Sequence, residues 1–352
     1  MPVLHTLDAF RTLLKTLPGP DSVARAKAMA REPTLTKPPG ALGRLEELTM
    51  WLCAWQGHHP PRLDHPAVVV FAGNHGIAAR GVSAYPAAVT AQMVANFEAG
   101  GAAINQICRV FGAALSVHPL ALDRPTADFT CAPALEEDEC ASALAAGMAA
   151  VPPGCDVLCV GEMGIANTTA AAALCHGLFG GTAEAWTGPG TGVDGERRAE
   201  KAKRVAQAVA LHRPALHDAV EGLRRLGGRE LAAMAGAIVA ARLQRVPVLL
   251  DGYVSTAAAA VLEVFTPGAL EHCVVAHVSA EPAHRVLCER LGQRPLLDLG
   301  LRLGEASGAA LALGILRGAV ACHTGMATFA EAGVSGGTVT PHRARSPQEH
   351  QF

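Results

Sequence analysis

The sequence predicts an α/β fold built on a mostly parallel sheet that helices cover on both faces. Half of the 352 residues are apolar and only 4% are aromatic, which suits small-residue helices packed on a sheet better than a β-sandwich. From residue 66 onward, short apolar runs precede glycine-containing turns and then helical stretches, a pattern typical of buried parallel strands. The length predicts one large domain with an accessory part, or two domains.

Three helices are expected before the first strand. Apolar residues recur at helical spacing over residues 4–17, and a Pro-Gly-Pro stop follows. A second helix is expected from about Asp21 until Pro33. Pro-Pro-Gly within residues 37–46 predicts a rigid turn that leads into a third helix through Trp55.

Six strands are expected in the part of the chain that follows. The apolar runs that predict them lie at 67–72, 113–117, 157–160, 185–186, 248–250 and 273–276, and the fourth run is weak. Ligands bind outside the carboxyl ends of the strands in such sheets. The polar turns that follow the runs are therefore expected to share one location.

Two Gly-rich turns are candidates for binding an anion. Residues 161–169 join a strand to an Ala-rich helix, so that free N–H groups and hydroxyls meet at a helix N-terminus. The same residues also fit an ordinary Asn or Thr helix cap. Residues 188–192 match neither a Rossmann dinucleotide loop nor a P-loop. Lys201, nine residues further on, resembles a solvated surface lysine when taken alone.

Other polar side chains follow the first and the last expected strands. Ser279 and Glu281 stand between His277 and His284, but a seven-residue spacing without an HExxH pattern does not favour zinc, and no metal site is expected. His75 is expected to be a hydrogen-bonded structural residue. The chain lacks a Gly-x-Ser-x-Gly elbow and a cysteine in an electropositive turn, so covalent catalysis is not favoured.

Glu305 is the carboxylate that the sequence places best for chemistry. It follows a glycine and stands at the start of a long apolar helix. A first-turn glutamate also stabilises an ordinary helix by ~0.3–1 kcal/mol, so its position alone leaves both interpretations open. Together with the anion-binding turns, it favours a transferase that acts on a phosphorylated small molecule.

Composition restricts the partners and the location of the protein. Lys and Arg number 29 against 31 Asp and Glu, without a basic stripe, so nucleic acid is a poor candidate partner. The ten cysteines lie mostly in apolar runs without CxxC spacing, which indicates reduced thiols in the cytoplasm. The N-terminus shows no secretory signal, and Arg317 and His323 interrupt the helix after Glu305, so no membrane span is expected. Residues 338–352 are expected to form a disordered tail.

A series of ordered motifs runs from residue 37 to residue 335. The motifs are Lys37-Pro38-Pro39-Gly40-Ala41-Leu42-Gly43-Arg44-Leu45-Glu46, His75-Gly76, Gly81-Val82-Ser83-Ala84-Tyr85-Pro86, Gly100-Gly101-Ala102-Ala103-Ile104-Asn105, Gly161-Glu162-Met163-Gly164, Gly190-Thr191-Gly192, Asp251-Gly252, Ser279-Ala280-Glu281-Pro282, Arg302-Leu303-Gly304-Glu305 and Met326-Ala327-Thr328-Phe329-Ala330-Glu331-Ala332-Gly333-Val334-Ser335. Through these motifs the chain resembles the nicotinate-nucleotide:dimethylbenzimidazole phosphoribosyltransferases, which make the lower-ligand nucleotide of cobalamin.

The resemblance implies a domain plan and an assembly. Helices from residues 1–60 and 303–337 would form a small helical bundle, beside a Rossmann-like α/β domain of residues 61–302 that carries the nucleotide site. It also implies a homodimer that acts on small-molecule substrates. No cofactor is expected.

The resemblance also assigns roles to individual residues. Glu305 matches the catalytic base. The residues that match substrate-binding positions are Glu162, Met163 and Gly164 at the nucleotide, Gly190, Lys201 and Ser279 around the phosphate, Gln92 at the base pocket, and Leu303.

The chemistry of the implied reaction needs one base. In nicotinate mononucleotide the leaving nitrogen is already a cationic pyridinium, so nicotinate can depart without a general acid. A benzimidazole nitrogen would attack C1′ while Glu305 accepts the ring proton, an effect typically worth ~10²–10⁴ in rate. An apolar pocket would raise the pKa of this carboxyl and a helix N-terminus would lower it.

The sequence departs from the family pattern at six positions. Asn74 stands where the family usually has an acidic residue, Ala166, Ala283 and Ala306 stand in place of glycine, and Pro189 and Val278 stand in place of arginine. The alanines are expected to bring a Cβ close to ligand contacts, and the lost cations to weaken attraction for an anionic substrate. Two alternatives stay open: a transferase with another acceptor, such as adenine, another benzimidazole or a phenol, and a non-catalytic nucleotide-binding protein.

Overall fold

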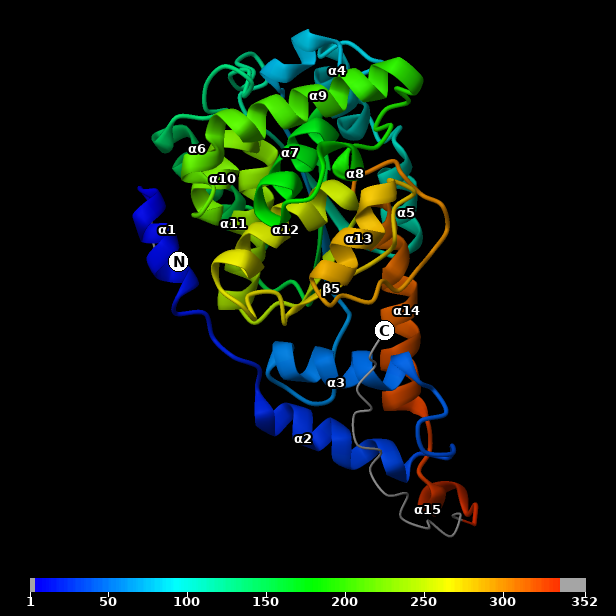
Figure 1. Cartoon of the computed structure of the whole chain (residues 1–352). Coiled ribbons are helices and arrows are strands. Elements are labelled where there is room, and N and C mark those ends of the chain that lie inside the picture. The colour runs from blue at the N-terminus through cyan, green and yellow to red at the C-terminus, as the bar shows by residue number, and fades with distance from the viewer. Residues whose placement is uncertain (1–3, 336–352) are drawn as a thin grey trace.

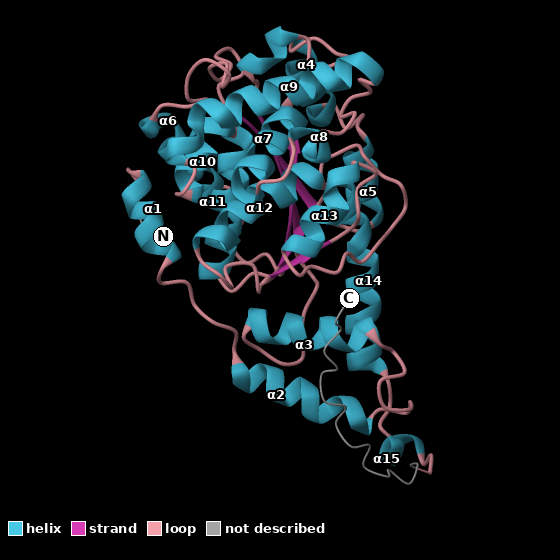
Figure 2. Ribbon diagram, in the orientation of Figure 1, coloured by secondary structure: helices cyan, strands magenta, loops and turns pink. Residues whose placement is uncertain are grey.

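A five-stranded parallel sheet lies at the centre of the molecule (Figure 2). The computed structural model describes residues 4–335, so the expected tail at 338–352 lies outside the described residues. The strands are β1 (Pro66–Ala72), β2 (Ala114–Pro119), β3 (Val157–Met163), β4 (Val248–Leu250) and β5 (Cys273–Val275). Their order is β2-β1-β3-β4-β5, which confirms the predicted α/β class. The strand order reverses between β1 and β3, the kind of point where ligands bind in open α/β sheets.

Helices surround the sheet (Figure 1). They are α1 (Leu7–Leu14), α2 (Ser22–Arg31), α3 (Arg44–Gln56), α4 (Ala88–Glu98), α5 (Ala103–Val110), α6 (Glu137–Ala149), α7 (Asn167–Phe179), α8 (Ala183–Trp186), α9 (Gly195–His212), α10 (Ala219–Leu226), α11 (Arg229–Leu243), α12 (Tyr253–Phe265), α13 (Pro282–Arg290), α14 (Ser307–Gly325) and α15 (Phe329–Ala332). Short 3₁₀ segments cover Glu32–Thr34, Gly76–Arg80 and Arg213–Ala215.

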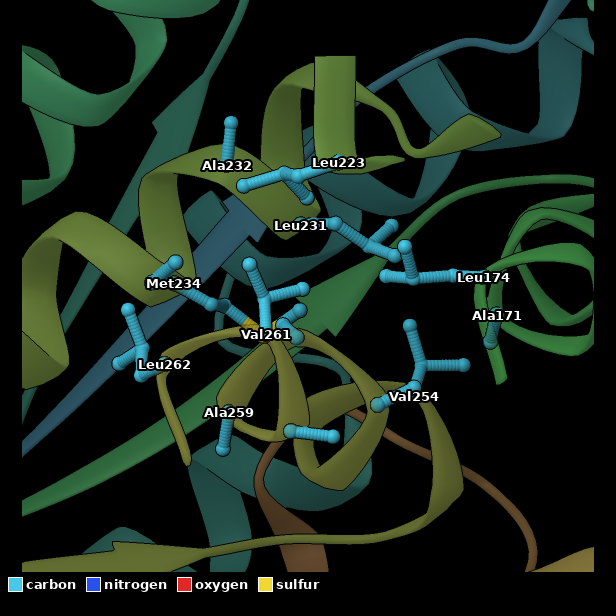
Figure 3. Packing of buried hydrophobic residues seen from close by; sticks show 14 of the residues in the cluster. Ala171, Leu174, Leu223, Leu231, Ala232, Met234, Val254, Ala259, Val261 and Leu262 are labelled. Atoms are coloured by element: carbon cyan, nitrogen blue, oxygen red, sulfur yellow. The ribbon is translucent and has the colours of Figure 1, made fainter. Parts of the chain in front are cut away.

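The two faces of the sheet have separate hydrophobic cores. Along β1, Val69 and Phe71 belong to one core and Val68 and Val70 to the other, because successive side chains of a strand point to opposite faces. Helices α6, α7, α11 and α12 contribute to the first core, and Figure 3 shows side chains of α7, α10, α11 and α12 meeting there. Helices α3, α5 and α14 contribute to the second. Both faces are therefore covered, as the unbroken apolar runs predict.

The fourth expected strand is a helix instead. Residues 185–186 belong to α8, whose first turn is capped by Thr182, the side chain of which accepts the N–H of Ala185. Trp186 stacks on Phe179, with ring centroids 5.8 Å apart, and donates its indole N–H to Gly180 O at 2.7 Å. A run of two apolar residues has no periodicity that distinguishes one buried helical turn from a strand.

The N-terminal helices do not pack as one group. Helix α1 lies against α6, and its residues Leu7, Phe10 and Leu14 are part of the first core. Helices α2 and α3 pack on each other, and α3 packs on α14 at the lower end of the view in Figure 1. An isolated bridge between Leu35 and Thr328 adds a direct link between the two chain ends. The helical group therefore consists of α2, α3 and the end of α14, with α1 elsewhere.

Helix α14 is long and apolar enough to cross a membrane by length and composition alone. It packs against α3, α5, β3 and β4, as a core helix does. One such helix is weak evidence for a span, since core helices pass the same test.

Candidate active site

A cavity of about 690 Å³ lies at the carboxyl ends of β3, β4 and β5. Seven of the expected site residues line it, namely Glu162, Met163, Gly164, Gly190, Ser279, Leu303 and Glu305. They come from the end of β3 and the turn after it, from the turn after β5, from the loop before α9 and from the segment before α14. The volume falls within the range of small-molecule sites.

Two expected site residues do not line the cavity. The side chain of Gln92 is exposed on α4, while Val89 and Met93 of the same helix line the cavity. Lys201 is 1% exposed, and its Nζ lies 2.9 Å from the hydroxyl of Thr168, which does line the cavity. Lys201 thus sits one side chain behind the wall, and the surface position that its sequence context suggests is wrong.

An unusual backbone holds Glu305. Gly304, Glu305 and Ala306 have φ angles of 85°, 62° and 64°, so three consecutive residues are left-handed. Helix α14 begins only at Ser307. Non-glycine residues in this region cost about 1–2 kcal/mol each, and such strain concentrates at functional sites. The segment is anchored to β3 because the N–H of Glu305 donates to Glu162 O at 3.1 Å.

Burial dominates the electrostatics of Glu305. Its side chain is 3% exposed, and Oε2 accepts the N–H of Ile104, in the first turn of α5, at 3.4 Å. Burial raises the pKa of Glu305, the Ile104 N–H opposes this rise, and the charge of Asp251 adds to it. A raised pKa makes the carboxylate a stronger base, which suits proton abstraction.

Glu162 is a second carboxyl group in the same wall. Burial, and then the charge of Asp251, raise the pKa of Glu162 to about 8, although a hydrogen bond from Asn167 opposes the rise. Glu162 is therefore largely protonated at neutral pH. A Cβ at residue 304 would lie 2.5 Å from Glu162 Oε1, so only glycine fits at Gly304.

The other end of the cavity is suited to an anion. Burial lowers the pKa of Lys201 to about 8, and Glu281 opposes this shift. Lys201 Nζ also lies 3.2 Å from Gly188 O, and Arg302 donates to Gly190 O at 3.1 Å. A Cβ at Gly190 would lie 2.5 Å from the Thr168 hydroxyl and 3.0 Å from Lys201 Nζ, so glycine is needed there for close approach.

Sequence reasoning did not assign several lining residues. Arg302 stands inside a quoted motif but received no role, and Tyr85, Val89 and Met93 form an apolar wall on the side of α4. The four-residue spacing of Val89 and Met93 is the signal that would have favoured them over Gln92, since residues four apart share a helix face.

The family departures lie behind the cavity wall. None of Ala166, Ala283, Ala306, Pro189 and Val278 is among its lining residues. Ala166 and Ala306 have φ angles of 77° and 64°, so both occupy positions where glycine would be unstrained. The expected intrusion of their Cβ atoms into the cavity is therefore not seen. Asn74 is buried and donates to Leu122 O at 2.9 Å.

Within residues 4–335, no group of three or more His, Cys, Asp or Glu side chains has the arrangement to hold a metal ion.

Comparisons with known proteins agree with this site. A protein family described as phosphoribosyltransferase matches residues 17–334. The chain is 61% identical to the nicotinate-nucleotide–dimethylbenzimidazole phosphoribosyltransferase of Sinorhizobium medicae, covering 93% of this chain and 97% of the relative. The enzyme of the same name from Ruegeria pomeroyi is also 61% identical, with 96% and 100% covered.

A solved structure shares the fold. The crystal structure of CobT from Thermus thermophilus superposes with a TM-score of 0.84 at 43% identity, covering 90% of this chain and all of the other. Together with the family match over most of the chain, these relatives settle the resemblance that the ordered motifs carry. The chain belongs to the nicotinate-nucleotide:dimethylbenzimidazole phosphoribosyltransferase family.

Proposed function

We propose that this protein transfers the phosphoribosyl group of nicotinate mononucleotide to 5,6-dimethylbenzimidazole, giving α-ribazole 5′-phosphate and nicotinate for cobalamin assembly. One observation carries the proposal most directly. The buried carboxyl of Glu305 lines a cavity of nucleotide size whose wall also includes Gly190 and Ser279, with Lys201 directly behind Thr168. A base and anion-binding groups around one cavity match an acceptor and a phosphoribosyl donor.

The substrates are oriented by this polarity. The phosphate lies toward Gly190, Ser279 and the N-terminal turn of α7, with the charge of Lys201 behind Thr168. The acceptor ring lies against Met93 and the neighbouring apolar wall, within reach of Glu305. Gln92 remains a proposed contribution to the base pocket.

The chemical step uses the carboxylate of Glu305. The C1′–N bond to the pyridinium breaks, its electron pair leaves with nicotinate, and the benzimidazole nitrogen forms the new bond to C1′ from the opposite face. Glu305 takes the ring N–H proton, so positive charge does not build up on the incoming base. Glu162, largely neutral at pH 7, presents a hydroxyl donor rather than a second base.

Glu305→Gln tests this role. We expect the variant to bind nicotinate mononucleotide but to lose turnover by ~10²–10⁴, because the amide cannot accept the ring proton. Nicotinate release and nucleotide affinity are measured separately. Glu200→Gln, on the exposed surface of α9, is the matched control and should keep wild-type turnover. Full turnover in Glu305→Gln would remove this residue from the base role.

A panel of acceptors distinguishes the alternatives. Preference for adenine, another benzimidazole or a phenol would favour a related transferase with a changed acceptor. Nucleotide binding without nicotinate release for every acceptor would indicate a non-catalytic protein.

We also propose a homodimer that works in the cytoplasm. All ten cysteines lie in the described part of the chain as free thiols, which suits a reducing compartment. Helix α2 leaves Val23 and Met29 exposed, which offers apolar surface for a second copy. Analytical ultracentrifugation should give twice the 36.2 kDa chain mass, and a monomer at micromolar concentration would contradict the dimer.

A further inference from the structure

Asp251 connects the end of β4 to the first turn of α14. Its side chain is 1% exposed, and Oδ1 accepts two backbone N–H groups, from Gly308 at 2.8 Å and from Ala309 at 3.0 Å. The residue that would normally cap this helix is Ala306, which has no side-chain acceptor. A carboxylate from another element therefore performs the capping.

The first turn of α14 has little room to move. A Cβ at Gly308 would lie 1.9 Å from Cδ2 of His277, and one at Gly161 would lie 2.2 Å from the N atom of Ala306. His277 Nε2 in turn lies 3.4 Å from Asp251 Oδ1. The turn is thus pressed against the ends of β3, β4 and β5, with Asp251 as its polar anchor.

We propose that Asp251 is a positioning residue for Glu305, because its carboxylate holds the first turn of α14 and so fixes the left-handed segment that aims the base into the cavity. The proposal rests on the proposed role of Glu305. Glu305 and Ala306, the two non-glycine residues of the left-handed segment, are strained and would relax without an anchor on both sides. One anchor is the bond from the N–H of Glu305 to Glu162, and the other is Asp251.

The charge of Asp251 has a second consequence. It contributes to the raised pKa values of both Glu305 and Glu162. The N–H of Ile104 binds the Glu305 carboxylate, and the other titratable side chains in the wall of the same cavity are Glu162, His277, Glu281, Arg302, Tyr85 and Tyr253. Asp251 therefore acts on Glu305 in two ways: its hydrogen bonds fix the position of the base, and its negative charge raises the pKa of the base.

The substitution Asp251→Asn separates these effects from simple folding. An Asn side-chain oxygen still accepts both N–H groups, but the negative charge is gone. The base must be ionised to work, so activity is lost as the pH falls through the pKa of Glu305. Since that pKa falls when the charge is removed, we expect the acid limb of kcat against pH to move down by about 0.5 unit or more.

The Asp251 substitutions should affect kcat more than they affect KM. For Asp251→Asn we expect kcat to fall about twofold to threefold, because the anchor is kept and only the basicity of the Glu305 carboxylate falls, while KM for nicotinate mononucleotide stays near the wild-type value. Asp251→Glu keeps the charge but moves the carboxyl by one methylene, so its kcat should fall while the acid limb stays near the wild-type position.

Asp218→Asn is the matched control. Asp218 Oδ1 caps α10 by the same pattern, accepting N–H groups from Val220 at 2.9 Å and Glu221 at 3.3 Å, and it lies outside the cavity. This variant should keep the wild-type kcat and pH profile. If Asp251→Asn does not fold, Asp251→Ser, a shorter neutral cap, is compared in its place.

The outcomes distinguish this inference from the proposed function. A wild-type kcat in Asp251→Glu, beside an inactive Glu305→Gln, would overturn the positioning role, and a wild-type pH profile in Asp251→Asn would overturn the effect of the Asp251 charge. Wild-type turnover in Glu305→Gln would overturn the proposed base, whatever the Asp251 variants do. A shifted acid limb in Asp251→Asn, with none in Asp218→Asn, supports the inference.

Discussion

Glu162 and Glu305 line the same cavity, and burial raises the pKa of both carboxyl groups. Burial and the charge of Asp251 raise the pKa of Glu162 to about 8. Burial also raises the pKa of Glu305, and the hydrogen bond from the Ile104 N–H opposes that rise. We propose that the two carboxyl groups take different roles in one reaction, with Glu162 as a neutral donor at neutral pH and Glu305 as the base.

Glu162→Gln should change how stability depends on pH. Below pH 4.5, the ordinary pKa of a glutamate, Glu162 is neutral in both the folded and the unfolded chain. As pH rises toward 8, only the unfolded chain ionises, so the wild type loses stability that the variant keeps. Since water in the cavity reaches the side chain, we expect the variant to gain about 1–3 kcal/mol over the wild type between pH 5 and pH 8.

Chemical denaturation at several pH values measures this difference. Glu331→Gln is the control, because the bonds from Thr328 lower the pKa of Glu331, so its protonation does not change over this range. A stability difference for Glu162→Gln that stays flat from pH 5 to pH 8 would show that Glu162 is ionised throughout.

For individual residues, the sequence predicted most of those that line the cavity, but not the contacts that fix their positions. Seven of nine expected site residues line the cavity, because each follows a strand or precedes a helix at one edge of the sheet. The N–H that binds the Glu305 carboxylate comes from Ile104, 201 residues earlier. Such a contact leaves no mark on local spacing, and neither does the left-handed backbone before α14.

At the scale of elements, glycines permit the close packing of α6 on α11. A Cβ at Gly147 of α6 would lie 1.8 Å from Ala233 O, and a Cβ at Gly236 of α11 would lie 2.0 Å from Leu144 O. The helices therefore touch backbone to backbone over the first core. Gly318, within α14, has no atom of another residue within 4 Å of the position where a Cβ would stand.

Gly236→Ala and Gly318→Ala should shift stability in opposite directions. The methyl group at residue 236 would force α6 and α11 apart, and we expect a loss of about 2–3 kcal/mol. At residue 318 the same change should stabilise the helix by about 0.5–1 kcal/mol, because alanine loses less backbone entropy than glycine. Urea denaturation of both variants measures the contrast. Equal effects would mean that α6 and α11 can separate without cost.

The helices and strands also show which sequence patterns predict secondary structure reliably. Five apolar runs became strands because each is an apolar segment followed by a turn: four runs are buried, and the run of the edge strand β2 is only partly buried. The weak run at 185–186 became the short helix α8, since its capping by Thr182 and its packing on Phe179 decide the outcome. The packing of α1 on α6 likewise depends on distant partners rather than on the pattern of α1 itself.

At the scale of the whole molecule, α14 joins the cavity to the helical group. Glu305 precedes its first turn, and His323 lies in its last turn. His323 Nδ1 contacts Glu32 Oε1 at 2.6 Å, and Lys37 Nζ lies 2.9 Å from Glu32 and 2.8 Å from Glu46. Lys37, which the sequence showed only as the start of a Pro-Pro-Gly turn, thus ties the segments after α2 and at α3 to α14.

Lys37→Met should destabilise the helical group without changing the chemistry. The side chain of Lys37 is 6% exposed, and its removal would leave the Glu32 and Glu46 carboxylates in a poorly hydrated place without their shared cation. Breaking a buried pair in this way costs about 3–5 kcal/mol. We expect a loss near the lower end of that range, since His323 and backbone groups still bind the two carboxylates.

Lys203→Met provides the comparison for this last prediction. Lys203 pairs with Glu200 at 2.5 Å on the exposed surface of α9, where water and salt screen an ion pair so that it adds little stability. His323 stands about 24 Å along α14 from Ser307, at a rise of 1.5 Å per residue. The folded fraction of Lys37→Met should therefore keep the wild-type kcat, measured by nicotinate release well below its unfolding midpoint. A matching fall in kcat would mean that the helical group and the Glu305 segment move together, so that α14 transmits changes between the two ends of the molecule.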